Sequence, residues 1–129
     1  MKLIVGRAAV GLAVVLLIVI AVANRQAPSD GSSGVAEVVL EEMRFKPNRI
    51  NAKVGVPLTV RLTNEGTQRH DLNFQSIHMP GLGGAESILE PGETRSITLT
   101  FDEPGTHLFI CTLPGHAAAG MTGALFVTP

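Results

Sequence analysis

Hydrophobic and polar residues alternate with a period of two in several short segments after residue 34. Residues 58–63 and 96–101 show this alternation over six positions each. The period is typical of strands that bury one face of a sheet. The same reasoning predicts further strands over residues 35–43, 70–74, 105–111 and 121–128, the first of them a one-sided or edge strand.

Turn-forming residues separate these segments at Asn64-Glu65-Gly66, Pro91-Gly92 and Pro104-Gly105. After residue 34, only residues 84–89 allow a short helix. About seven or eight short strands in roughly 95 residues indicate an all-β fold, and we expect a Greek-key β-sandwich.

The N-terminal segment has a different pattern. Lys2 and Arg7 precede an unbroken run of apolar residues and glycine that ends in Ala21-Val22-Ala23. Such a run predicts a hydrophobic helix over residues 1–23, either a cleaved signal peptide or a transmembrane anchor, and we favour the anchor. Both alternatives place the remainder outside the cytoplasm, in the periplasm or at the cell surface. Residues 24–34, rich in Ser, Gly and Pro, are expected to form a flexible linker to a single domain at 35–129.

Composition narrows the classes of function. The 129 residues carry a net charge of −1, which becomes −3 without the N-terminal segment, because that segment contains two basic residues and no acid. A mildly acidic domain argues against a nucleic-acid-binding surface. The single cysteine, Cys111, excludes an intrachain disulfide.

The segment from Cys111 to Met121 contains the candidate chemistry. It reads CTLPGHAAAGM, so His116 lies five residues after the cysteine and five before the methionine. The cysteine ends one predicted strand and the methionine begins the next, so the sheet should hold the ends of this loop together. The loop is short enough to turn His116 back toward the point that both sulfur residues face.

A fourth ligand has to come from elsewhere, and His70 is the best candidate because a neighbouring strand could bring it alongside. Two imidazoles and a thiolate in one plane, with a weak axial thioether, suit a blue-copper electron-transfer site. The predicted ligands of one type 1 copper ion are therefore His70, Cys111, His116 and Met121. A structural zinc site fits less well, because a thioether is not a usual zinc ligand.

Each of these residues also has a purely structural interpretation. A buried lone cysteine usually behaves as a small hydrophobe, and a methionine at the start of a strand is often part of the core. His70 shares its strand face with apolar residues and could be a packed core histidine. For His107 we favour a structural role, and for His78 a place in a solvated loop over a secondary metal contact.

From about residue 35 to residue 129 the chain resembles the type 1 (blue) copper proteins of the plastocyanin/azurin, or cupredoxin, family. It is most similar to small membrane-associated prokaryotic members with a CTxPGHxxxGM ligand loop. The resemblance implies a Greek-key sandwich with copper near one end. It also implies one-electron transfer through the ring edge of His116, which protrudes through an apolar patch around Leu113 and residues 117–119.

Two residues depart from the family pattern. Many members carry Asn directly after the first histidine ligand, where it ties the two ligand segments together, whereas this chain has Asp71. An ionised carboxylate accepts hydrogen bonds but cannot donate them. The family often has Tyr in the strand before the cysteine, at the position of His107.

We therefore expect an electron carrier outside the cytoplasm that docks redox proteins such as a cytochrome or a terminal oxidase. The alternative is a copper-binding chaperone or delivery module for a membrane oxidase, because the same four ligands serve both functions. A catalytic copper enzyme is not expected, since only His78 and His107 remain to build a second copper cluster. Neither a nucleic acid nor a small-molecule substrate is expected as a partner.

Overall fold

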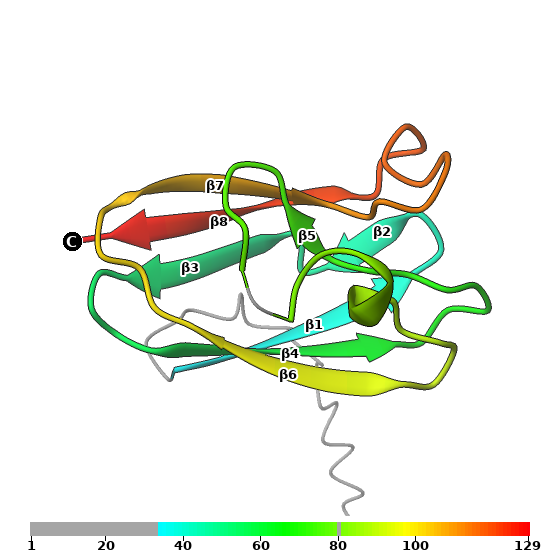
Figure 1. The fold of residues 1–129 in the computed structure, drawn as a ribbon, viewed down its shortest axis with the longest axis horizontal. Helices are drawn as coiled ribbons and strands as arrows, with labels where there is room; N and C mark the ends of the chain where they lie inside the picture. The colour runs from blue at the N-terminus through cyan, green and yellow to red at the C-terminus, as the bar shows by residue number, and fades with distance from the viewer. Residues whose placement is uncertain (1–33, 80) are drawn as a thin grey trace, which may run out of the picture.

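A computed structural model describes residues 34–79 and 81–129 and shows two four-stranded sheets packed face to face (Figure 1). One sheet has the order β2-β1-β4-β6 and the other the order β3-β8-β7-β5. The strands are β1 (Val35–Glu41), β2 (Arg44–Lys46), β3 (Arg49–Lys53), β4 (Leu58–Asn64), β5 (Asn73–Phe74), β6 (Thr94–Leu99), β7 (Gly105–Ile110) and β8 (Thr122–Thr128). The predicted all-β sandwich is therefore confirmed.

The topology mixes parallel and antiparallel pairing. β1 pairs parallel with β4, and β3 pairs parallel with β8, whereas the other strand pairs are antiparallel. Because β2 belongs to one sheet and β3 to the other, the chain crosses between the sheets after β2. β1 lies between β2 and β4, so it is not an edge strand. Its alternating burial shows the other predicted alternative, a strand with one buried face.

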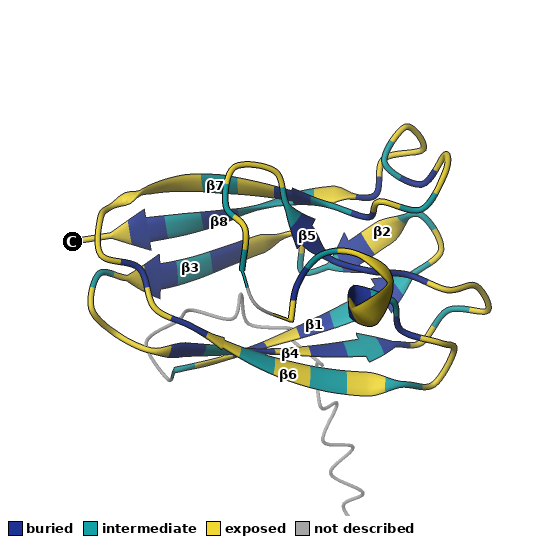
Figure 2. Ribbon diagram, in the orientation of Figure 1, coloured by how far each residue is buried: buried dark blue, intermediate teal, exposed yellow. Residues whose placement is uncertain are grey.

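Alternation along the strands builds the core. In β4 the even-numbered residues from Leu58 to Asn64 are buried and the intervening ones are not. Figure 2 shows this banding along the strands of both layers, and the buried apolar residues of the two sheets form one core that fills the space between them. Phe109 lies in this space, edge-on to Phe45 at 5.1 Å and to Phe74 at 5.8 Å between ring centroids. This aromatic cluster lies beneath β7, the strand that leads to Cys111.

The strand predicted over residues 70–74 is shorter than expected. Only Asn73 and Phe74 form β5, and His70 makes an isolated bridge with Leu89 through two backbone hydrogen bonds of 3.2 and 2.8 Å. The sheet ladder does not extend to Asp71, because its side chain, rather than its backbone, bonds the neighbouring Thr112 amide. The short helix considered for residues 84–89 is a 3₁₀-helix, η2 (Ala85–Ser87).

The predicted N-terminal helix, residues 1–23, lies outside the described residues, as does the linker except for Gly34. Within residues 34–79 and 81–129, no helix is long and apolar enough to cross a membrane.

Candidate metal centre

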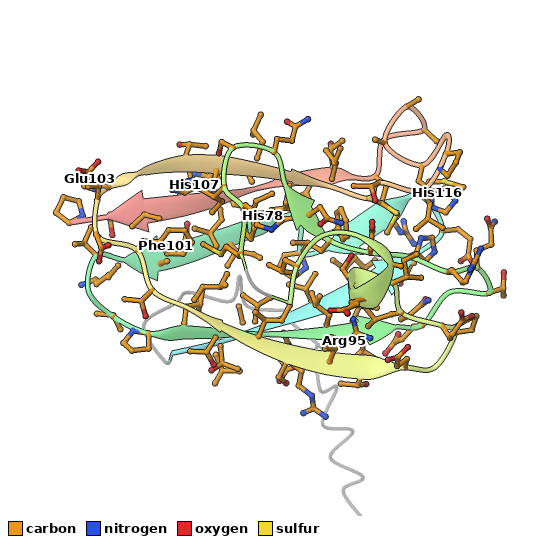
Figure 3. All side chains as sticks on the ribbon, in the orientation of Figure 1. His78, Arg95, Phe101, Glu103, His107 and His116 are labelled. Carbon is orange, nitrogen blue, oxygen red and sulfur yellow. The ribbon has the colours of Figure 1, made fainter. Side chains whose placement is uncertain are left out.

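Three of the four predicted ligands meet at one end of the sandwich. One donor atom from each of His70, Cys111 and His116 lies within 4.8 Å of the other two, and all three residues are buried. The Nδ1 atoms of the two histidines are 3.2 Å apart, and the Cys111 Sγ lies 3.4 Å from the His116 Nδ1. Figure 3 shows His116 at the end of the molecule formed by the loop after β7. Among the described residues, no second group of this kind occurs.

Short-range hydrogen bonds fold the loop from Cys111 to Met121. The Cys111 amide donates to the Met121 carbonyl at 3.1 Å, which closes the loop where β7 and β8 separate. The Met121 amide donates to the His116 carbonyl at 3.0 Å, so the histidine is drawn back over the loop ends. Gly115 and Gly120 both have positive φ angles, which L-residues with side chains rarely adopt. The predicted return of His116 toward Cys111 is therefore observed.

Met121 is fully buried and belongs to the core, directly after the loop and before β8. Its backbone is held to both Cys111 and His116 by the two bonds just described. Met121, the fourth predicted ligand, is thus held by backbone hydrogen bonds to two of the other predicted ligands. Its role as an axial ligand remains a prediction.

The donor set fits a single metal ion. Two ligand atoms that are each roughly 2.0–2.3 Å from one ion lie about 3–4 Å apart, as the two measured separations do. The His70 Nε2 atom is buried and has no hydrogen-bond partner within residues 34–79 and 81–129. The other ring nitrogen, Nδ1, faces the His116 Nδ1 and is the atom that would bind an ion at this point. Thiolate, imidazole and thioether donors together suit copper.

Burial shifts the pKa values of two of the predicted ligands, His70 and Cys111, in opposite directions. Burial lowers the pKa of His70, and the neighbouring His116 lowers it further. Burial raises the pKa of the Cys111 thiol, because a thiolate is costly in an apolar environment. The metal-free site therefore favours a neutral imidazole, which is ready to bind, and a protonated thiol, which must lose its proton first.

Asp71 connects the two segments that carry His70 and Cys111. Its Oδ1 accepts the Thr112 amide hydrogen at 2.6 Å, and its Oδ2 accepts the Thr112 hydroxyl and the Asn73 side-chain amide, the latter at 2.8 Å. The carboxylate is 1% exposed. The hydrogen bonds that connect these two segments are thus all accepted by the Asp71 carboxylate, at the position where the resemblance led us to expect Asn.

The segment before His70 is held by the turn predicted at Asn64-Glu65-Gly66 and by Glu42, whose contact with Thr67 was not expected from the sequence. The Asn64 side chain donates to the carbonyls of Gln68 and Leu89 at 2.8 and 3.0 Å, and its Oδ1 accepts the Gly66 amide hydrogen. The Glu42 carboxylate accepts both the amide and the hydroxyl hydrogen of Thr67. The Asn-x-Gly pattern after β4 was the available signal, because such turns use the Asn side chain as a backbone mimic.

Beside His116 lies a shallow hollow of about 400 Å³. Its lining residues are Thr67, Gln68, Arg69, Glu90, Pro91, Leu113 and His116. His116 itself is 7% exposed. The hollow next to this histidine therefore combines the apolar residues Pro91 and Leu113 with one exposed positive and one exposed negative side chain, Arg69 and Glu90.

The two remaining histidines lie outside the ligand group. His107 stacks on Phe101 with ring centroids 5.0 Å apart, toward the opposite end of the molecule from His116 (Figure 3). His78 is exposed in the loop between β5 and η2.

Comparison with known proteins gives matches over most of the chain. A family model described as a cupredoxin-like domain matches residues 12–123. The copper-resistant cuproprotein CopI of Pseudomonas aeruginosa is 26% identical, and the alignment covers 82% of each chain. Auracyanin-B of Chloroflexus aurantiacus is 54% identical over 43 residues, which are 33% of this chain but only 18% of that protein. A copper-containing nitrite reductase of Rhizobium meliloti is 31% identical over 57% of this chain and 21% of its own length.

Solved structures share the fold. Reduced auracyanin from Roseiflexus castenholzii superimposes with a TM-score of 0.66 at 24% identity, over 77% of this chain and all of that one. Auracyanin B superimposes with a TM-score of 0.62 at 23% identity, over 81% of this chain and 92% of that one. A multicopper oxidase aligns over 74% of this chain and 42% of its own, with a TM-score of 0.62. The same fold thus occurs in two auracyanins and in part of a multicopper oxidase.

Proposed function

The chain belongs to the cupredoxin-like family, and we propose that it is a one-electron carrier with a single type 1 copper ion. The observation that carries this proposal is the convergence of His70, Cys111 and His116 within 4.8 Å at one end of the fold. Met121 is the proposed axial ligand. A copper ion bound there would alternate between Cu(II) and Cu(I), with imidazoles suited to the first state and sulfur ligands to the second.

The protein supplies rigidity and a route for the electron. Cys111 and Met121 are joined by a backbone hydrogen bond, and His116 is bonded to Met121, so the three cannot move independently. A site held in one geometry needs little rearrangement when its charge changes. Among the proposed ligands, His116 is the one that lines the surface hollow, so its ring is the proposed exit and entry point for electrons.

We also propose that a redox protein docks over this hollow and that the domain works outside the cytoplasm, anchored by residues 1–23. The apolar residues Leu113 and Pro91 would be covered by the partner. Arg69 and Glu90 at the same hollow would orient it, in a way that depends on ionic strength. The anchoring proposal rests on the sequence pattern of the N-terminal segment.

The test is the optical and EPR spectrum of the protein after addition of Cu(II). We expect an intense visible band that Cys111→Ser abolishes, because the band arises from the thiolate–copper bond. His78→Asn is the matched control, since it removes an exposed histidine outside the ligand group, and it should keep the band. A band that survives Cys111→Ser would refute the assignment.

The second candidate is a copper-delivery module, and the similarity to a copper-resistant cuproprotein over 82% of both chains favours it. A carrier should retain its copper through repeated chemical reduction and oxidation. A delivery module should release Cu(I) to a competing Cu(I) chelator within a single reduction. Copper quantification after each cycle separates the two functions.

A further inference from the structure

Asp71 is a buried carboxylate beside the candidate copper site that no basic side chain neutralises. It is 1% exposed, and it forms no ion pair within residues 34–79 and 81–129. Burial of an unpaired charge is costly unless hydrogen bonds replace the lost water. A group retained under these conditions is a candidate for a functional role.

The surroundings of Asp71 are built for a negative charge. Three hydrogen atoms point at its two oxygens, from the Thr112 amide, the Thr112 hydroxyl and the Asn73 side-chain amide. An ionised carboxylate, which only accepts, satisfies all three donors at once. If Asn replaced Asp71 in the same orientation, its NH₂ group would face the NH₂ group of Asn73. The Asn73 NH₂ group also lies 3.4 Å from the Ser87 hydroxyl oxygen.

The Asp71 carboxylate lies close in the chain to two of the proposed metal ligands. Asp71 directly follows His70, and Thr112 directly follows Cys111. The bonds between Asp71 and Thr112 therefore join the two ligand-bearing segments one residue away from each ligand. Because the carboxylate is buried, water and salt screen its field at the site only weakly.

We propose that Asp71 is a positioning residue that lowers the reduction potential of the copper site through its buried negative charge. This inference rests on the proposed function. One electron from a donor protein converts Cu(II) to Cu(I), with no bond broken and no proton transferred. A nearby negative charge stabilises the more positive Cu(II) state, so that state is reduced less readily. The chain thus sets a lower potential than an Asn at this position would give.

The experiment compares reduction potentials of the wild-type protein, Asp71→Asn and Glu90→Gln by redox titration of the visible band, at low and at high salt. Glu90 is exposed at the hollow beside His116, so its loss removes one negative charge at the surface. We expect Asp71→Asn to favour Cu(I) by at least about tenfold, an upward shift of about 59 mV for one electron, and the shift should persist at high salt. The Glu90→Gln shift should be smaller and should vanish at high salt. An Asp71→Asn shift that is absent, downward or removed by salt would overturn the inference.

A second variant separates charge from geometry and serves if Asp71→Asn does not fold. Thr112→Val has nearly the shape of Thr112 but lacks the hydroxyl that partly offsets the carboxylate charge. Its potential should stay level or fall, opposite to Asp71→Asn, and a rise would overturn the proposed effect of the charge. Thermal unfolding of the metal-free variants measures how much the hydrogen bonds between Asp71 and Thr112 stabilise the fold, independently of copper. If the wild-type protein shows no blue Cu(II) band, the proposed function fails. If the band is present but the potentials are equal, only the role of Asp71 fails.

Discussion

Gly123 offers a sharp test of how the core supports the candidate metal centre. It lies in β8 directly opposite Phe109 in β7, two residues after Met121. A Cβ atom added to Gly123 would lie 2.3 Å from two carbons of the Phe109 ring and 2.6 Å from the Asn48 carbonyl oxygen. Gly123 has no positive φ angle, so the substitution Gly123→Ala adds volume without backbone strain.

The expected cost follows from what must move. Phe109 is fully buried and makes edge-on contacts with both Phe45 and Phe74, so any displacement of its ring disturbs both contacts. Overpacking a core costs about 1–3 kcal/mol, and each aromatic pair contributes about 0.5–1.5 kcal/mol. We expect Gly123→Ala to lower the free energy of unfolding by about 3 kcal/mol. For a domain of this size that corresponds to a fall in Tm of roughly 12–24 °C.

The assay is urea and thermal unfolding of the metal-free protein followed by far-UV circular dichroism, because the chain has no Trp or Tyr for fluorescence. Gly105→Ala in β7 is the matched control, since its Cβ would meet only the His107 Nε2, at an ordinary 3.8 Å. The control should change stability by less than about 0.5 kcal/mol. Adding Phe109→Leu to Gly123→Ala should recover part of the loss, as expected for residues in direct contact. Equal stabilities of the two alanine variants would refute the packing argument.

Three further predictions concern the surroundings of the site. Hydrogen bonds from Thr67 lower the pKa of Glu42 to about 2 from its ordinary 4.5, so the stability it contributes is fully present above pH 4.5 and is lost as the pH falls toward 2. Glu42→Gln should therefore be less stable than wild type near neutral pH and equal to it near pH 2 in acid-unfolding curves; a constant difference across this range would contradict the assignment. Met121→Gln should keep the copper but lower its reduction potential, because an amide oxygen favours Cu(II) more than a thioether does, and an unchanged potential would argue against axial coordination. Replacement of Leu113 or Ala118 by Glu should slow electron exchange with a partner protein in stopped-flow measurements while the visible spectrum stays unchanged, and loss of copper would show instead that these residues shape the site.

The sequence predicted the fold because period-two alternation reports burial directly. β4 includes the alternating residues 58–63 and β6 the first four of the alternating residues 96–101, and the apolar positions of both strands pack in or against the core. The same signal does not report which strands become neighbours. The parallel pairs β1–β4 and β3–β8 join strands that are far apart in the sequence, and a local pattern does not encode such pairing.

The candidate site was predictable to the extent that its proposed ligands are close in sequence. Cys111, His116 and Met121 share one short loop, so spacing alone places them together. His70 was identified by residue type, but its position before β5 depends on Asp71, whose side chain takes the Thr112 amide away from the sheet ladder. A sequence pattern treats Asp71 as a polar residue in a strand, and only the folded arrangement shows it buried between the two ligand segments.

The acid–base state of the site follows from the same burial that holds it together. His70 and Cys111 share one buried end of the sandwich, and burial favours the uncharged form of each: it lowers the pKa of the imidazole and raises that of the thiol. For His70 the uncharged form is already the metal ligand, whereas for Cys111 it is not, because the thiolate is the ligand. Metal uptake therefore has to displace a proton from the thiol. Asp71 acts on the pKa of Cys111 in both directions, since its backbone hydrogen bond lowers that pKa and its carboxylate raises it, so burial is the main reason that the thiol keeps its proton.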